Sequence, residues 1–385
     1  MEYGELAPFE GQEFENAINR LKQYPQLLNN FTDIISRHSR IVNSIMSRQA
    51  KKKLVSLLNS VHNCDDFQKK ITSDLFLSII ESSSMDEFSF GGISDLDPNG
   101  SYLFISNHRD IILDCALLDL ALYRSGRNLC EMAIGNNLLV NQFTTDLFKV
   151  NGAITVKRDS DNSSNLRQDT YMLSSYIKHC ILDKKKSVWI AQKSGRSKDG
   201  KDETSASVLK MLYYASKQDG LSLSDYLKLV QIIPVSVSYQ FDPCDVSKGQ
   251  QEIKKLKAEG CYNIYKKKKY ADMLDMVRGL RMYKGNVHIQ VGKPISSDIS
   301  NIGEAVNQID YQIHNNYKLW DTNYFSYDYL ENGDKYSNEY KAFNKKKFLK
   351  RYDGLSSEII NQVLNTYANP VRSKYNLIGK GEKNE

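Results

Sequence analysis

A histidine and a carboxylate lie close together where a predicted strand gives way to a predicted helix. The segment Ser106–Asp114 reads SNHRDIILD, and Asp114 interrupts an otherwise apolar helical run. A carboxylate on a mostly buried helix needs a polar partner, and His108 lies just upstream. Because residues six apart lie on different faces of one helix, we expect His108 in the turn before the helix, folded back over its first turns. There the helix dipole would keep the imidazole neutral and able to act as a general base.

Two further polar segments follow predicted strands and suit an anion. The strand Gly152–Arg158 ends in Lys157 and Arg158, and a second apolar strand runs into the loop Gln192–Gly200. This loop contains three cations and two glycines. A guanidinium makes paired hydrogen bonds to phosphate or carboxylate, and glycine allows close approach of the backbone. The alternative interpretation is that both segments are ordinary solvated turns.

The elements that would position these side chains alternate between strand and helix. Short β-type runs are predicted at 102–106, 129–134, 153–157, 187–191, 231–239 and 287–291, with helical patterns at 111–123, 138–148, 166–182 and 205–215. This alternation predicts an α/β fold with a largely parallel sheet flanked by helices. Such sheets bind ligands outside the carboxyl ends of their strands, where the polar segments fall. Pro234, inside the run 231–239, predicts an edge strand or a bulge.

The chain divides by pattern into three regions. Residues 1–86 are predicted to form a helical N-terminal region, because apolar residues recur there at helical spacing without strand-like alternation. Residues 87–297 would form the α/β core. Residues 298–385 return to helical patterns and are predicted to form a helical C-terminal extension.

Composition limits the classes of protein to consider. The net charge is +6, with 41% hydrophobic and 25% charged residues, as is usual for a globular protein. No apolar run approaches the roughly 20 residues that cross a bilayer, and the N-terminus lacks the pattern of a secretory signal. We therefore expect a cytoplasmic protein whose lysine-rich runs could attract it peripherally to the inner face of the membrane. No nucleic-acid partner is expected, and the six scattered cysteines do not predict zinc or disulfides.

The polar segments after the predicted strands and the proline-containing strand, taken in chain order, resemble the four sequence blocks of the phospholipid/glycerol acyltransferase superfamily. The matches are Asn107, His108 and Asp114 to the Asn-His-x-x-x-x-Asp block; Gly152 and Arg158 to the Gly-x-x-x-x-x-Arg strand; Gly195, Arg196 and Ser197 to the Glu-Gly-(Thr/Gly)-Arg-Ser loop; and Pro234 to the Pro-containing strand. The resemblance spans roughly residues 88–294. The His-Arg pair and the Gly-Arg-Ser-x-x-Gly loop are closer to the glycerol-3-phosphate branch than to the lysophosphatidate branch.

The resemblance implies acyl transfer from acyl-CoA or acyl-carrier protein to glycerol-3-phosphate or a lysophosphatidate-like acceptor in phospholipid biosynthesis. His108 would be the general base and Asp114 would orient it and stabilise the imidazolium. The acceptor phosphate would be held by Arg158, Gly195, Arg196 and Ser197, with Arg109, Lys157 and Lys193 as further candidates, while Asn107, Gly152 and Pro234 would be structural. No metal ion, cofactor or covalent acyl-enzyme is implied.

Two departures from the family pattern leave alternatives open. Five residues separate His108 from Asp114, where the family has four, so Asp110 is a second candidate for the carboxylate role and otherwise a helix N-cap. Lys193-Ser194 stands where the family has a glutamate before the Gly-Arg step. The alternatives are acyl transfer to another lipid or amino-lipid headgroup, and a non-catalytic protein that binds membrane surfaces through the same fold.

Overall fold

The computed structural model describes residues 3–24, 43–157, 163–260 and 270–381, and its centre is a seven-stranded sheet. The strand order is β1-β7-β6-β2-β5-β3-β4. The strands are β1 (Met85–Gly91), β2 (Leu103–Ser106), β3 (Glu131–Gly135), β4 (Ala153–Val156), β5 (Val188–Ala191), β6 (Ile232–Tyr239) and β7 (Gly285–Val291). All neighbours pair in parallel except β6 and β7, which are antiparallel. The predicted α/β fold with a largely parallel sheet is confirmed, and six of its strands coincide with the six predicted runs.

The sequence pattern missed one strand, β1. Its buried and exposed residues do not alternate, and five of its seven residues are partly or fully exposed. It lies at the edge of the sheet beside β7. An edge strand with few apolar residues lacks the period-2 signal that identifies a strand from sequence.

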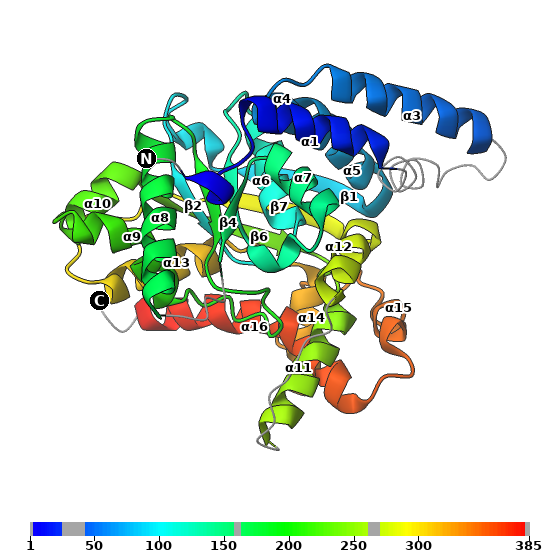
Figure 1. The fold of residues 1–385 in the computed structure, drawn as a ribbon. Helices are drawn as coiled ribbons and strands as arrows, with labels where there is room; N and C mark the ends of the chain where they lie inside the picture. Colours follow the sequence, from blue (N-terminus) through cyan, green and yellow to red (C-terminus); the bar gives the residue numbers. More distant parts are fainter. Residues whose placement is uncertain (1–2, 25–42, 158–162, 261–269, 382–385) are drawn as a thin grey trace.

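Helices cover both faces of the sheet (Figure 1). One face carries α6 (Leu113–Arg124) and the other carries α8 (Ser163–Leu182), α9 (Ala206–Gln218), α10 (Leu223–Val230) and α13 (Ile302–Asn316). Side chains of the central strands alternate between these faces: Phe104 packs toward α6, whereas Leu103 and Ile105 pack toward the second group. Burial on both faces explains why the central strands read as continuous apolar runs.

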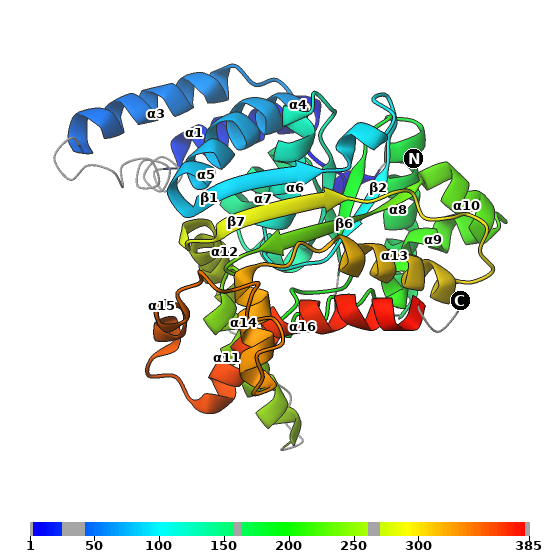
Figure 2. The same ribbon diagram turned by 180° about the vertical axis from the view of Figure 1, so that it is seen from behind.

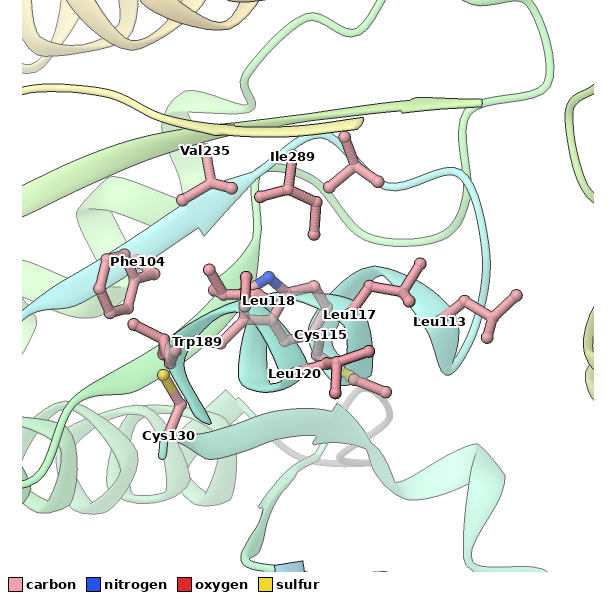
Figure 3. Packing of buried hydrophobic residues seen from close by; sticks show 14 of the residues in the cluster. Phe104, Leu113, Cys115, Leu117, Leu118, Leu120, Cys130, Trp189, Val235 and Ile289 are labelled. Atoms are coloured by element: carbon pink, nitrogen blue, oxygen red, sulfur yellow. The ribbon is translucent and has the colours of Figure 1, made fainter. Parts of the chain in front are cut away.

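Helix α6 lies inside the molecule except for its last two residues, Tyr123 and Arg124, and its first turn carries Asp114. Figure 3 shows its leucines packed among side chains of β2, β5, β6 and β7. Every residue from Leu113 to Leu122 is buried. A helix that is apolar around its whole circumference is held rigidly by its surroundings. The carboxylate of Asp114 is therefore fixed in place by the core.

Further helices surround the sheet, some before β1, some between its strands and some after β7 (Figure 2). Before the sheet lie α1 (Gly11–Gln23), α3 (Asn43–Asn59), α4 (Cys64–Phe67), the π-helical segment η3 (Gln68–Leu77) and α5 (Ser78–Ser84). The others are α7 (Gln142–Val150), α11 (Asp245–Gly260), α12 (Ala271–Arg281), α14 (Asp321–Leu330), α15 (Lys345–Leu349) and α16 (Ser357–Gly381). Among the described residues, no helix is both long enough and apolar enough to cross a bilayer.

Pro234 does not mark an edge strand or a bulge, so that prediction is wrong. Strand β6 lies between β7 and β2, and its pairing with β2 continues regularly through Pro234. The Pro234 carbonyl accepts from the amide of Gly292, one residue beyond the end of β7. The N–H and C=O of a strand residue point the same way, so the N–H that proline lacks would point toward β7. It would do so where the β6–β7 ladder begins, so the strand tolerates its loss.

A glycine after β5 allows α16 to approach the core closely. Gly200 has φ +79°, and a Cβ there would lie 2.2 Å from the carbonyl oxygen of Thr366 in α16. We expect Gly200→Ala to lower the free energy of unfolding by about 2–4 kcal/mol, through backbone strain and the steric clash together. Gly126→Ala is the matched control, because Gly126 has φ +68° but a Cβ added there would meet no atom within 4 Å. Urea unfolding should show a clearly smaller loss for the control, and equal losses would contradict the close contact.

Candidate active site

The catalytic candidates meet at the carboxyl ends of β2 and β5. His108 lies in the loop between β2 and α6, and Gly195 and Arg196 lie in the loop after β5. All three line one cleft of about 690 Å³. The backbone amide of Ser197 donates to the carbonyl of His108 over 2.6 Å, so the two loops are joined directly.

His108 and Asp114 form a buried pair. The distance from His108 Nδ1 to Asp114 Oδ2 is 3.0 Å. The same oxygen accepts from the amides of Arg109 and Asp110, at 2.7 and 2.9 Å. A carboxylate in this setting acts as an acceptor, so Nδ1 carries the proton and donates. The other ring nitrogen, Nε2, is then the basic one, and His108 lines the cleft.

Tyr239, at the end of β6, completes the hydrogen bonding of Asp114. Its hydroxyl donates to Asp114 Oδ1 over 2.9 Å. Burial, together with the charge of Asp114, raises the pKa of Tyr239 well above its ordinary value, so the hydroxyl stays protonated. Sequence analysis missed Tyr239, since a tyrosine at the end of an apolar strand carries no signal of its own.

Asp110, the second candidate for the carboxylate, has a different place. Its Oδ1 accepts from the amides of Ile112 and Leu113, at 3.0 and 2.9 Å, and so closes the turn into α6. Burial and the neighbouring charge of Asp114 raise the pKa of Asp110. The extra residue between His108 and Asp114 is accommodated in this turn, and it is Asp114 that contacts the imidazole.

An aromatic and aliphatic wall faces the imidazole. The rings of Trp189 and His108 lie edge to face, with centroids 6.1 Å apart. Trp189 is held by its indole N–H, which donates to Ser106 Oγ over 2.9 Å. Ile111, Ile134 and Leu138 line the same cleft. An apolar wall beside a few polar groups is the usual construction of a ligand site.

Arg196 presents a buried cation to the cleft. Its Nη2 donates to Asp275 of α12 over 2.7 Å, while Nη1 has no hydrogen-bond partner among the described residues. The preceding Gly195 has φ +80°, a backbone conformation that glycine adopts without strain. Ser194 also lines the cleft, where the family has glutamate. The carboxylate that holds Arg196 comes from Asp275, which sequence analysis did not identify.

Arg109 does not line the cleft, although the sequence made it a candidate for phosphate binding. It is 1% exposed and donates to Asp202 Oδ2 at 2.6 and 3.0 Å and to Asp242 Oδ2 at 3.2 Å. Its backbone carbonyl accepts from Lys248 Nζ over 3.0 Å. Its guanidinium also reaches the carbonyl of Thr366 in α16. Arg109 thus ties the loop of His108 to the C-terminal helices.

The remaining predicted residues divide between the cleft and the scaffold. Lys193 lines the cleft. Lys157 instead extends to Asp169 over 2.9 Å, on a different part of the surface. Ser197 is buried, and its hydroxyl accepts from the amide of Gly200. Arg158 lies outside the described residues.

Two residues predicted to be structural make structural contacts. Asn107 joins the end of β2 to β6, because its side chain accepts from the amide of Val237 at 2.8 Å and donates to its carbonyl at 3.0 Å. Gly152 has φ +81° in the turn before β4, close to Gln68. The Asn107 contact sets where β2 ends, and hence where the loop of His108 begins, whereas Gly152 lies at the start of β4.

Part of the chain is similar to a known protein family. Residues 87–238, which include the four sequence blocks, match the family model described as Acyltransferase. Among solved structures, the chain is similar to the 1-acyl-sn-glycerophosphate (LPA) acyltransferase PlsC from Thermotoga maritima, with 11% identity, a TM-score of 0.37, and 78% of this chain and 91% of that chain covered. No curated protein sequence matches the chain. The similarity to the Acyltransferase family thus covers residues 87–238, a segment that includes His108, Asp114 and Arg196.

Proposed function

We propose that this chain transfers a fatty acyl group from acyl-CoA or acyl-carrier protein to the hydroxyl of glycerol-3-phosphate or a lysophosphatidate-like acceptor. The observation that carries the proposal is one cleft with three components: the His108–Asp114 pair, an apolar wall and the partly unpaired guanidinium of Arg196. A base, a surface for an acyl chain and a buried cation are what this reaction needs. The proposed place of action is the cytoplasmic face of the membrane.

In the proposed reaction His108 Nε2 removes the proton from the acceptor hydroxyl as the oxygen attacks the thioester carbonyl. The imidazolium is stabilised by Asp114, which the core and Tyr239 hold in place. When the tetrahedral intermediate collapses, the C–S bond breaks and the thiolate leaves with the proton from His108. The proposed chemistry uses no metal ion and no acyl-enzyme intermediate.

The proposed role of Arg196 is to hold the acceptor phosphate near His108. Its Nη1 supplies donors that no described residue occupies, and Lys193 adds a second cation in the cleft. A fixed phosphate would hold the hydroxyl beside the base, which lowers the entropic cost of reaching the transition state.

The reaction is tested by measuring thiol release from palmitoyl-CoA and from an acyl-carrier-protein thioester. Glycerol-3-phosphate, lysophosphatidate and an amino-lipid acceptor are supplied singly, beside a control without acceptor. Release that depends on a phosphate-bearing acceptor supports the proposal. Release with the amino-lipid alone would support the alternative acceptor that Lys193-Ser194 leaves open. Folded protein that is silent with every acceptor would favour a membrane-surface binding protein.

Replacing Arg196 should weaken use of the phosphate-bearing acceptor. We expect Arg196→Gln to lower kcat/KM for the acceptor about 10- to 100-fold, because charge-assisted hydrogen bonds contribute roughly 1.5–3 kcal/mol. Most of the change should be in KM for the acceptor, with the KM for the thioester little altered. Lys157→Gln is the control, since Lys157 lies away from the cleft. Equal effects on acceptor and thioester KM would contradict a role in phosphate binding.

A further inference from the structure

Helix α12 has an unusual solvent-facing surface. The exposed side chains between Tyr270 and Tyr283 are, in order along the chain, Tyr270, Leu274, Val277, Arg278, Arg281 and Tyr283. Leu274 is 56% and Val277 40% exposed. Residues 270, 274, 277, 278 and 281 recur at helical spacing, so they form one stripe along the helix. This stripe is apolar and cationic and includes no acidic side chain, whereas a helix face in water is normally covered by mixed charges.

The acidic residues of the same helix face inward, toward the cleft. Asp275 is buried and binds Arg196, and Asp272 lines the cleft and bonds to Asn137. Gly279 lies against Asp110 of the catalytic loop, where a Cβ would meet Asp110 Oδ2 at 2.2 Å. Helix α12 therefore contacts the proposed active site with one side and presents the apolar, cationic stripe on the other.

We propose that this stripe docks the protein onto the surface of a bilayer containing anionic lipids. In this arrangement Leu274 and Val277 enter the interface, Arg278 and Arg281 pair with lipid phosphates, and the two tyrosines lie at headgroup level. The inference rests on the proposed function, since a lipid acceptor must reach the cleft beside α12. It adds the surface by which the chain meets the membrane.

The charges of the stripe favour a lipid surface over a second copy of this chain. A second copy would bring Arg278 and Arg281 against a surface with the same positive charges, if the stripe paired with itself. An anionic bilayer supplies a counter-charge for each arginine and an apolar layer for the aliphatic side chains. Arg278 reaches the buried Asp275 over 3.3 Å, and its side chain is still 57% exposed. Asp86, at the end of the stripe, accepts from the Tyr283 hydroxyl.

The proposal is tested by co-sedimentation of the full chain with vesicles of phosphatidylcholine, with and without phosphatidylglycerol. We expect binding only to the anionic vesicles, and we expect Leu274→Ser/Val277→Ser to weaken it about tenfold or more. Arg281→Gln should weaken binding about fivefold and reduce its dependence on salt. The matched control is Leu166→Ser/Leu229→Ser, which removes apolar side chains that are 46% and 43% exposed on α8 and α10.

Three outcomes would overturn the proposal. The first is wild-type protein that does not bind anionic vesicles, and the second is a Leu274→Ser/Val277→Ser variant that binds them as tightly as the wild type. The third is a wild-type protein that is dimeric in solution while this variant is monomeric. Thiol release with soluble glycerol-3-phosphate, measured in parallel, separates this inference from the proposed function. Activity without vesicle binding would disprove docking alone, and vesicle binding without acyl transfer to any acceptor would disprove the enzyme alone.

Discussion

His108→Ala is expected to lower kcat for acyl transfer about 10²- to 10⁴-fold, the range in which a positioned general base contributes. The imidazole lines the cleft, and its Nδ1 is paired with the buried carboxylate of Asp114, which leaves Nε2 as the basic nitrogen. The measurement is acceptor-dependent thiol release under saturating thioester. KM values should change little, because the base acts on the hydroxyl in the transition state and contributes little to binding.

Asp114→Asn provides the companion test. The amide retains the size of the side chain but replaces one acceptor oxygen with a donor, whereas four donors now reach the carboxylate: His108 Nδ1, the amides of Arg109 and Asp110, and the Tyr239 hydroxyl. The loss in kcat should approach that of His108→Ala, and the double variant should be little worse than either, because the pair acts as a unit. Full activity in His108→Ala with unaltered secondary structure would rule out the base role.

Arg109→Met is expected to lower the free energy of unfolding by about 3–5 kcal/mol, the cost of leaving buried partners of an ion pair uncompensated. Arg109 and its partners Asp202 and Asp242 are all nearly inaccessible to solvent. The neutral side chain would leave Asp202 without its cation in a buried site. Urea denaturation followed by circular dichroism measures the change.

Acid unfolding checks the same pair independently. Burial alone would raise the pKa of Asp202, but the charge and hydrogen bonds of Arg109 lower it below its ordinary value. A lowered folded-state pKa stabilises the protein above the ordinary aspartate pKa, and this stabilisation is lost as pH falls through the lowered value. Arg109→Met should therefore reduce the loss in free energy of unfolding as the pH falls through this range.

Lys157→Met is the control, because it breaks an exposed pair, and it should change the free energy of unfolding by no more than about 1 kcal/mol. Similar losses in both variants would contradict the special role of Arg109.

The sequence by itself determined the fold class and the region of the site. Alternating strand and helix patterns predicted six strands of a largely parallel sheet, and those strands are present. Such a sheet brings the carboxyl ends of its parallel strands to one edge. His108, which follows β2, and Arg196, which follows β5, could therefore be expected to meet, and they line one cleft. Local periodicity and chain order suffice for this conclusion.

Only the tertiary structure decided which side chains pair within that region. Asp114 rather than Asp110 contacts His108 because the turn before α6 uses Asp110 to bind its own amides. Arg109 points into the core because Asp202 and Asp242 lie there, and Arg196 is held by Asp275 from a helix 79 residues later in the chain. Tyr239 reaches Asp114 across 125 residues. Contacts of this range depend on how the elements pack, and no local pattern in a single sequence encodes them.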